Sequence, residues 1–78
     1  MPTIHVDGFQ IRIIPGDHDP AHVHVSKGGG ECVFLIAERV VRLREARGMT
    51  ASEVRRSAAA VASVCEQLLR LWDEVHDG

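Results

Sequence analysis

The chain has 78 residues, of which 45% are hydrophobic and 26% charged, and its formal net charge is −2. This size supports one hydrophobic core, so we expect a single small domain over residues 1–78. No apolar run approaches the roughly 20 residues that span a bilayer, and the first residues lack the pattern of a secretion signal. We therefore expect a cytoplasmic protein with no membrane segment.

Residues 3–13 predict a β-hairpin. The runs "TIHV" and "FQIRII" alternate between apolar and polar residues, and the Asp7-Gly8 dipeptide between them suits a two-residue turn. Pairing across this turn places the large apolar residues on one face, with Val6 opposite Phe9, Ile4 opposite Ile11, and Ile13 beyond them.

The stretch "HDPAHVHV", residues 18–25, contains three of the five histidines. A loop rich in Pro, Gly and Asp leads into a short strand, "HVHVS", in which residues two apart share a face. If Val23 and Val25 face the core, His22 and His24 face outward, on the side of His5. After "KGGG", the run "ECVFLIA" predicts a central strand.

Three interpretations of these histidines remain open. His22 and His24 could chelate one metal ion, with His18, Asp17, Asp19 or Glu31 as a third ligand. Alternatively, His22, His24 or His18 could act as an acid or base in RNA cleavage. The simplest interpretation is an outer strand face without a ligand. Because neither three nor four ligands are evident, we expect no metal and no cofactor.

The second half of the chain predicts a strand and a long helix. Residues 38–47 fit either a helix or a strand, and the alternation of arginines with Val41 and Leu43 favours a strand. A capping box formed by Thr50 and Glu53 predicts a helix from about Ala51 to about His76.

The apolar stripe of this helix includes Trp72, which we expect to be buried against the sheet. The stripe is wider than one sheet contact requires. We therefore expect the surplus residues Val64, Leu69 and Leu71 to form an interface in a homodimer or with a small protein partner.

Positive charge is concentrated in residues 39–56, which hold six of the nine basic residues and two of the eleven acidic ones. Such a patch favours contact with phosphate or an acidic partner, so nucleic acid remains a possible ligand; a solvated face with local ion pairs is the ordinary alternative. The candidate contact residues are Arg39, Arg42, Arg44 and Arg47.

These elements predict an α+β fold, an antiparallel sheet of four or five strands with a long C-terminal helix packed on one face. We expect Cys32 and Cys65 to be buried thiols and not a disulfide.

Several stretches together resemble a known family over essentially the whole chain. They are "MPTI", "DGFQI", "HDPAHVHV", "GGGECVF", "ARGMTASEVRR" and "LLRLWDEVH". On these stretches the chain is similar to the bacterial family catalogued as domain of unknown function 4160, although residues 19–21 depart from the consecutive prolines of its pattern. His18, Pro20, His22 and His24 fall on the family signature.

The resemblance implies no established activity. It implies a small protein partner of the domain of unknown function 2442 type, in an arrangement similar to toxin–antitoxin modules. We therefore expect a protein-interaction module, one half of a two-protein regulatory or toxin–antitoxin pair. The alternatives are a small histidine-dependent ribonuclease or nucleic-acid-binding protein, and a metal-binding domain that uses the His-x-His strand; whether the protein is an enzyme stays open.

Overall fold

The computed structural model describes residues 2–76. Within them lie five β-strands, a short 3₁₀ helix and two α-helices. Their bounds are β1 Thr3–Val6, β2 Phe9–Arg12, β3 His22–Lys27, β4 Gly30–Leu35, η1 Ala37–Arg39, β5 Arg42–Arg47, α1 Ala51–Ser63 and α2 Cys65–His76.

The five strands form one antiparallel sheet in the order β1-β2-β3-β4-β5, so each strand pairs with its neighbour in sequence. The predicted first hairpin is confirmed in turn and in register. Asp7 and Gly8 both have positive φ, 49° and 80°, as a two-residue hairpin turn of this kind requires. Val6 pairs with Phe9 and Ile4 with Ile11.

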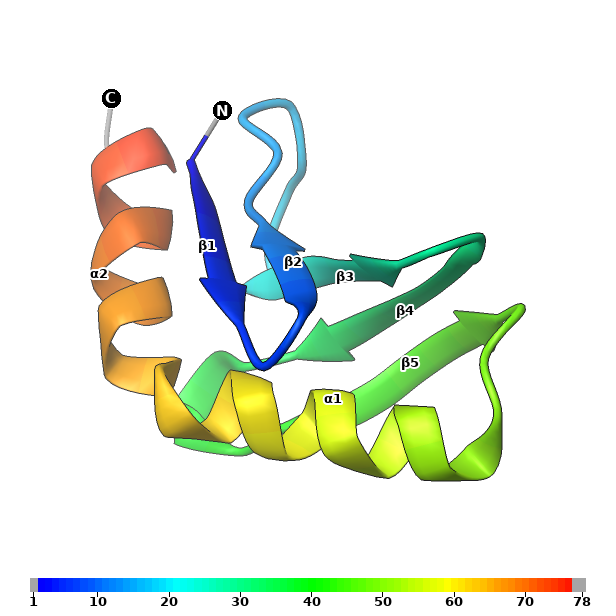
Figure 1. Cartoon of the computed structure of the whole chain (residues 1–78). Helices are drawn as coiled ribbons and strands as arrows, with labels where there is room; N and C mark the ends of the chain where they lie inside the picture. Colours follow the sequence, from blue (N-terminus) through cyan, green and yellow to red (C-terminus); the bar gives the residue numbers. More distant parts are fainter. Residues whose placement is uncertain (1, 77–78) are drawn as a thin grey trace.

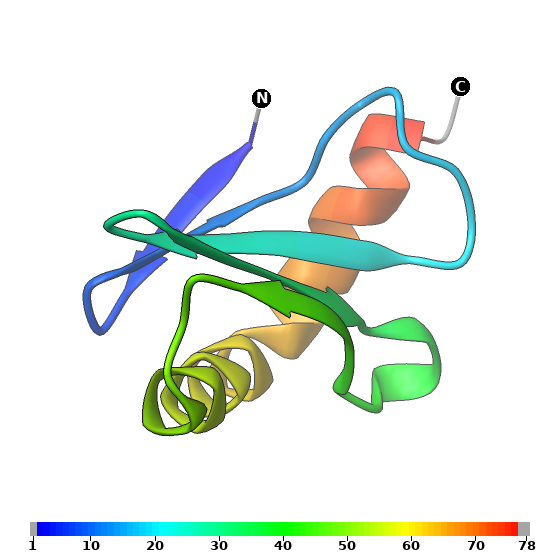
Figure 2. The same cartoon turned by 90° about the vertical axis from the view of Figure 1, so that its right-hand side faces the viewer.

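Both helices lie on the same side of the sheet and run in different directions (Figures 1 and 2). The core fills the space between the two layers. Alternate strand residues supply one side of it and one stripe of each helix supplies the other. Its largest members are Phe9, Ile11, Ile13, Val23, Val25, Phe34, Ile36, Val61, Leu68 and Trp72.

The prediction of one long helix is wrong, because the helical segment breaks at Val64. The backbone there has φ −124° and ψ 19°, outside the helical region. The β-branched Val64 follows Ser63, and neither residue favours a helix interior. The break gives α1 and α2 separate directions (Figure 1). Both helices contribute apolar residues to the core.

The strand predicted within residues 38–47 is confirmed for β5 and wrong for its first part. Glu38 and Arg39 have positive φ, 62° and 63°, which an extended strand does not allow. They belong to η1, which carries the chain from β4 into β5.

Cys32 and Cys65 are both free and buried, as predicted. Burial raises the pKa of each thiol above its ordinary value, so both stay protonated at neutral pH. Among the described residues, no helix is long and apolar enough to cross a membrane.

Candidate metal centre

The histidines of β3 alternate with core valines, as the sequence predicts. Val23 and Val25 are fully buried beneath the helices, and the intervening His24 is half-buried on the opposite face. Strand pairing sets Arg12 beside His24 on one side and Val33 on the other. The outer face of the sheet therefore carries His24 at its centre.

His22 departs from the expectation of an exposed outer strand face, because only 6% of it is exposed. Its Nδ1 lies 2.9 Å from the carbonyl oxygen of Pro20, in the loop that leads into β3. Its ring centroid lies 5.3 Å from that of Trp72 in α2. The loop and the second helix together enclose the imidazole, an arrangement that strand alternation alone does not indicate.

Both histidines converge on Asp17, which lies in the same loop. One oxygen of Asp17, Oδ2, lies 2.9 Å from Nε2 of His22 and 2.8 Å from Nε2 of His24. The three ligand atoms all lie within 4.8 Å of one another. Two ligands of one tetrahedral zinc ion lie about 3.3 Å apart, given zinc–ligand bonds of about 2.0 Å. A small outward adjustment of these side chains would therefore seat an ion.

The hydrogen bond at Nδ1 of His22 determines whether its Nε2 acts as a donor or as an acceptor. A carbonyl oxygen only accepts, so Nδ1 must carry a hydrogen and donate to Pro20. In the neutral ring Nε2 is then a lone pair, and it faces an oxygen of Asp17 that also only accepts. This contact is favourable only if the imidazole is doubly protonated or if a cation lies between the two atoms. The Nδ1 contact to a backbone carbonyl is also the usual outer contact of a metal-bound histidine.

Electrostatics at Asp17 favour its charged form. Burial alone would raise the pKa of this carboxyl group, but the hydrogen bond from His24 and the charges of both histidines outweigh it. The pKa of Asp17 is therefore lowered from 3.8. At neutral pH the centre thus contains a carboxylate, which is the form that binds a metal ion.

Of the four residues proposed as a third ligand, only Asp17 joins the two histidines. His18 is exposed, and Asp19 lines a different pocket. Glu31 forms ion pairs with one arginine of β2 and one of β5. Sequence spacing does not separate these candidates, because all but Glu31 lie in one loop whose conformation decides which side chain turns inward.

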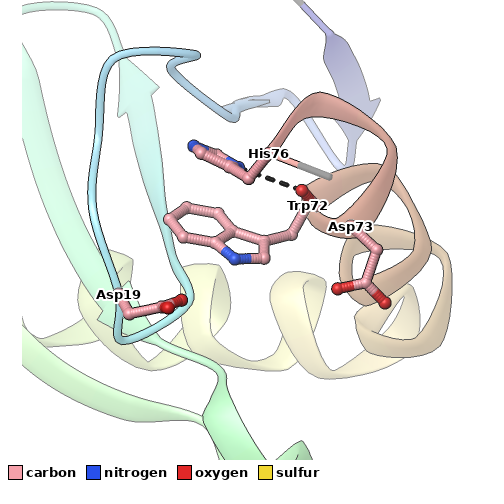
Figure 3. Close-up of a pocket in the computed structure, with 4 residues that line it drawn as sticks. All are labelled: Asp19, Trp72, Asp73 and His76. Atoms are coloured by element: carbon pink, nitrogen blue, oxygen red, sulfur yellow. Dashed lines mark hydrogen bonds between the residues drawn. The ribbon is translucent and has the colours of Figure 1, made fainter. Parts of the chain in front are cut away.

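The C-terminal end of α2 lies beside this loop, and it forms a pocket of about 310 Å³ lined by Asp19, Trp72, Asp73 and His76 (Figure 3). His76 stacks on Trp72 with ring centroids 3.8 Å apart, and its Nδ1 donates to the Trp72 carbonyl oxygen, 2.9 Å away. Trp72 is buried, as predicted, and its ring also contacts His22. Sequence reasoning missed His76, although its i, i+4 spacing from Trp72 was a signal.

The four arginines proposed as anion contacts are all exposed. Arg39 pairs with Glu66 at 3.1 Å and Arg47 with Glu31 at 3.2 Å, whereas Arg42 and Arg44 line separate pockets.

The proposed interface residues are half-buried against the core; they are Val64, Leu69 and Leu71.

A model of the family described as a domain of unknown function, DUF4160, matches residues 8–73. The chain belongs to this family. The match includes the complete loop and strand that carry Asp17, His22 and His24. Neither a curated protein nor a solved structure matches the chain significantly.

Proposed function

We propose that this protein is a metal-binding domain that holds a divalent transition-metal ion, with zinc as the reference case, between Asp17, His22 and His24. The observation that carries the proposal is the convergence of two imidazole Nε2 atoms on one carboxylate oxygen. Two imidazoles and a carboxylate form a common ligand set for such ions. The Nδ1 contact of His22 to Pro20 supplies the outer hydrogen bond that orients a ligand.

The number of ligands indicates the kind of centre. Structural zinc sites are closed by four protein ligands, whereas catalytic sites have three and keep one position open. Within residues 2–76, no fourth His, Cys, Asp or Glu joins the group of three. The side chains of Asp17 and His24 keep 24% and 18% of their surface exposed, so an ion there remains accessible to solvent. The proposed centre is of the open type.

The test is zinc binding by chelator-treated protein, measured by isothermal titration calorimetry and by the melting temperature. An ion that binds only the folded state stabilises it by about 2.7 kcal/mol at 100 times its Kd. For a domain of this size, that corresponds to an increase of roughly 10–20 °C. The expected stoichiometry is one ion per chain.

The variants His24→Gln and Asp17→Asn should lose the zinc-dependent shift. Both residues keep some exposure, and circular dichroism checks that each variant folds. His5→Gln is the matched control, because His5 is exposed on β1 and lies outside the group of ligands. An equal shift in all four proteins, or none in the parent, would overturn the proposal.

A second proposed function is a protein-interaction module, either a homodimer or one half of a two-protein regulatory or toxin–antitoxin pair. Two large apolar residues near the edge strand β5 support it, since Val40 is 46% exposed and Leu43 is 50% exposed. A pocket of about 340 Å³ adjoins Val40. A cytoplasmic location belongs to this proposal, and the two free thiols support it.

Sedimentation velocity of the parent and two variants tests the interaction proposal. Leu43→Glu changes the exposed site, and Leu69→Glu changes the interface expected from the helix pattern. Loss of self-association in either variant, with the fold intact, would identify the surface. A parent that stays monomeric at high concentration would exclude the homodimer, and no binding of a co-produced small protein of the domain of unknown function 2442 type would exclude the pair.

A further inference from the structure

A pocket of about 350 Å³ opens beside the proposed metal centre. It lies on the outer face of the sheet, where His24 pairs with Val33 and Val33 with Glu45. The lining consists of both histidine ligands together with Val33, Arg44 and Glu45. A molecule in this pocket would therefore contact the two imidazoles and one guanidinium group.

Arg44 is the cation that this pocket can use. Arg39 and Arg47 are already in ion pairs with carboxylates. Across the part of the chain that the structure describes, Arg44 has no ion pair to a carboxylate, and it is the arginine that lines the pocket with both histidines.

The backbone gives a reason for the position of Arg44. The pairing of β4 with β5 skips this residue, because Val33 pairs with Glu45 and Phe34 pairs with Leu43. Alternation from Arg42, which pairs with Leu35 on the outer face, places Arg44 on that face with the histidines. The bulge keeps Glu45 on the same face, so that both side chains line the pocket.

We propose that this pocket binds a phosphate group, which occupies the open position of the metal ion and accepts hydrogen bonds from Arg44. The proposal rests on the metal-binding function proposed above. Guanidinium donors match the spacing of phosphate oxygens and can bind two of them at once. The two charges of the ion and that of Arg44 also outweigh the carboxylates of Asp17 and Glu45, so the loaded site attracts an anion.

Glu45 gives the proposal a second, opposite consequence. Its carboxylate lies on the rim of the same pocket and repels an anion that approaches the ion and Arg44. Removal of this charge should therefore strengthen phosphate binding, whereas removal of the Arg44 charge should weaken it. A pocket with no anion site would show neither effect.

The test uses protein loaded with one equivalent of Co²⁺, whose visible spectrum reports its ligands. Titration with inorganic phosphate should change this spectrum, and acetate should change it less. Arg44→Gln should weaken phosphate binding by about tenfold to a hundredfold, and Glu45→Gln should strengthen it. Arg55→Gln is the matched control, because it removes one exposed positive charge from α1.

Two stages of this experiment separate the two proposals. Failure of the parent to bind Co²⁺ would overturn the metal centre and the inference that rests on it. Normal Co²⁺ binding with no spectral response to phosphate, or an equal response in Arg44→Gln and the parent, would overturn only the phosphate site.

Free phosphate and the phosphate groups of RNA share the chemistry that this pocket recognises. Arg42 lies on the same strand, in the row of the sheet that contains His22 and Leu35. A short single-stranded RNA would extend along this row, whereas inorganic phosphate would not. If RNA is the natural ligand, Arg42→Gln should weaken the binding of RNA and leave the binding of inorganic phosphate unchanged. If free phosphate is the natural ligand, Arg42→Gln should change the binding of neither.

Discussion

Replacement of Trp72 by alanine should lower the free energy of unfolding by about 3–5 kcal/mol. The side chain is 5% exposed, and a buried tryptophan removes about 150–250 Å² from water. At about 25 cal/mol per Å², this burial is worth roughly 4–6 kcal/mol, of which alanine keeps a small part. The ring also loses its stacking with His76 and its contact with His22.

This loss is large for a chain of 78 residues, whose total stability is expected to be about 4–12 kcal/mol. Urea unfolding followed by far-ultraviolet circular dichroism measures it, because the variant has no tryptophan left for fluorescence. Leu43→Ala is the control and should change stability by less than about 0.5–1 kcal/mol, since Leu43 is half exposed. A loss below about 1 kcal/mol in Trp72→Ala would refute the packing of α2 described above.

Four further predictions concern the scaffold. Gly30→Ala should destabilise the protein by about 1–3 kcal/mol in urea unfolding, because the added Cβ would lie 2.6 Å from the carbonyl oxygen of Gly48; unchanged stability would contradict this contact. Thr50→Ala should cost about 1 kcal/mol through loss of the helix cap. Hydrogen bonds from Thr50 lower the pKa of Glu53 from 4.5. The contribution of the Glu53 carboxylate to folding stability is therefore complete above pH 4.5, and it is lost as the pH falls through the lower pKa of the folded state. Glu53→Gln should flatten this acid dependence of the melting temperature. The two buried thiols should react with a disulfide reagent only at the unfolding rate, and rapid labelling of the native protein would show that they are accessible.

Local sequence patterns determine much of the scaffold. The Asp7-Gly8 turn predicts its hairpin and register because both turn residues tolerate positive φ, which few other dipeptides do. The capping box formed by Thr50 and Glu53 predicts the start of α1, since both of its hydrogen bonds lie within one turn of chain. The alternation of β3 assigns Val23 and Val25 to the core.

Tertiary structure decides the remainder, because contacts between segments distant in the sequence are not encoded in local periodicity. The helix break at Val64 sends α1 and α2 in separate directions over one core, which the continuous apolar periodicity of residues 51–76 does not show. His22 is buried because Trp72, fifty residues later in the sequence, contacts its ring. The conformation of one loop decides that Asp17 contacts the two histidines, whereas the adjacent His18 is exposed to solvent. The sequence alone therefore named His22 and His24 as candidate ligands and Asp17 as one of four candidates for the third, and only the fold brings Asp17 to the two histidines.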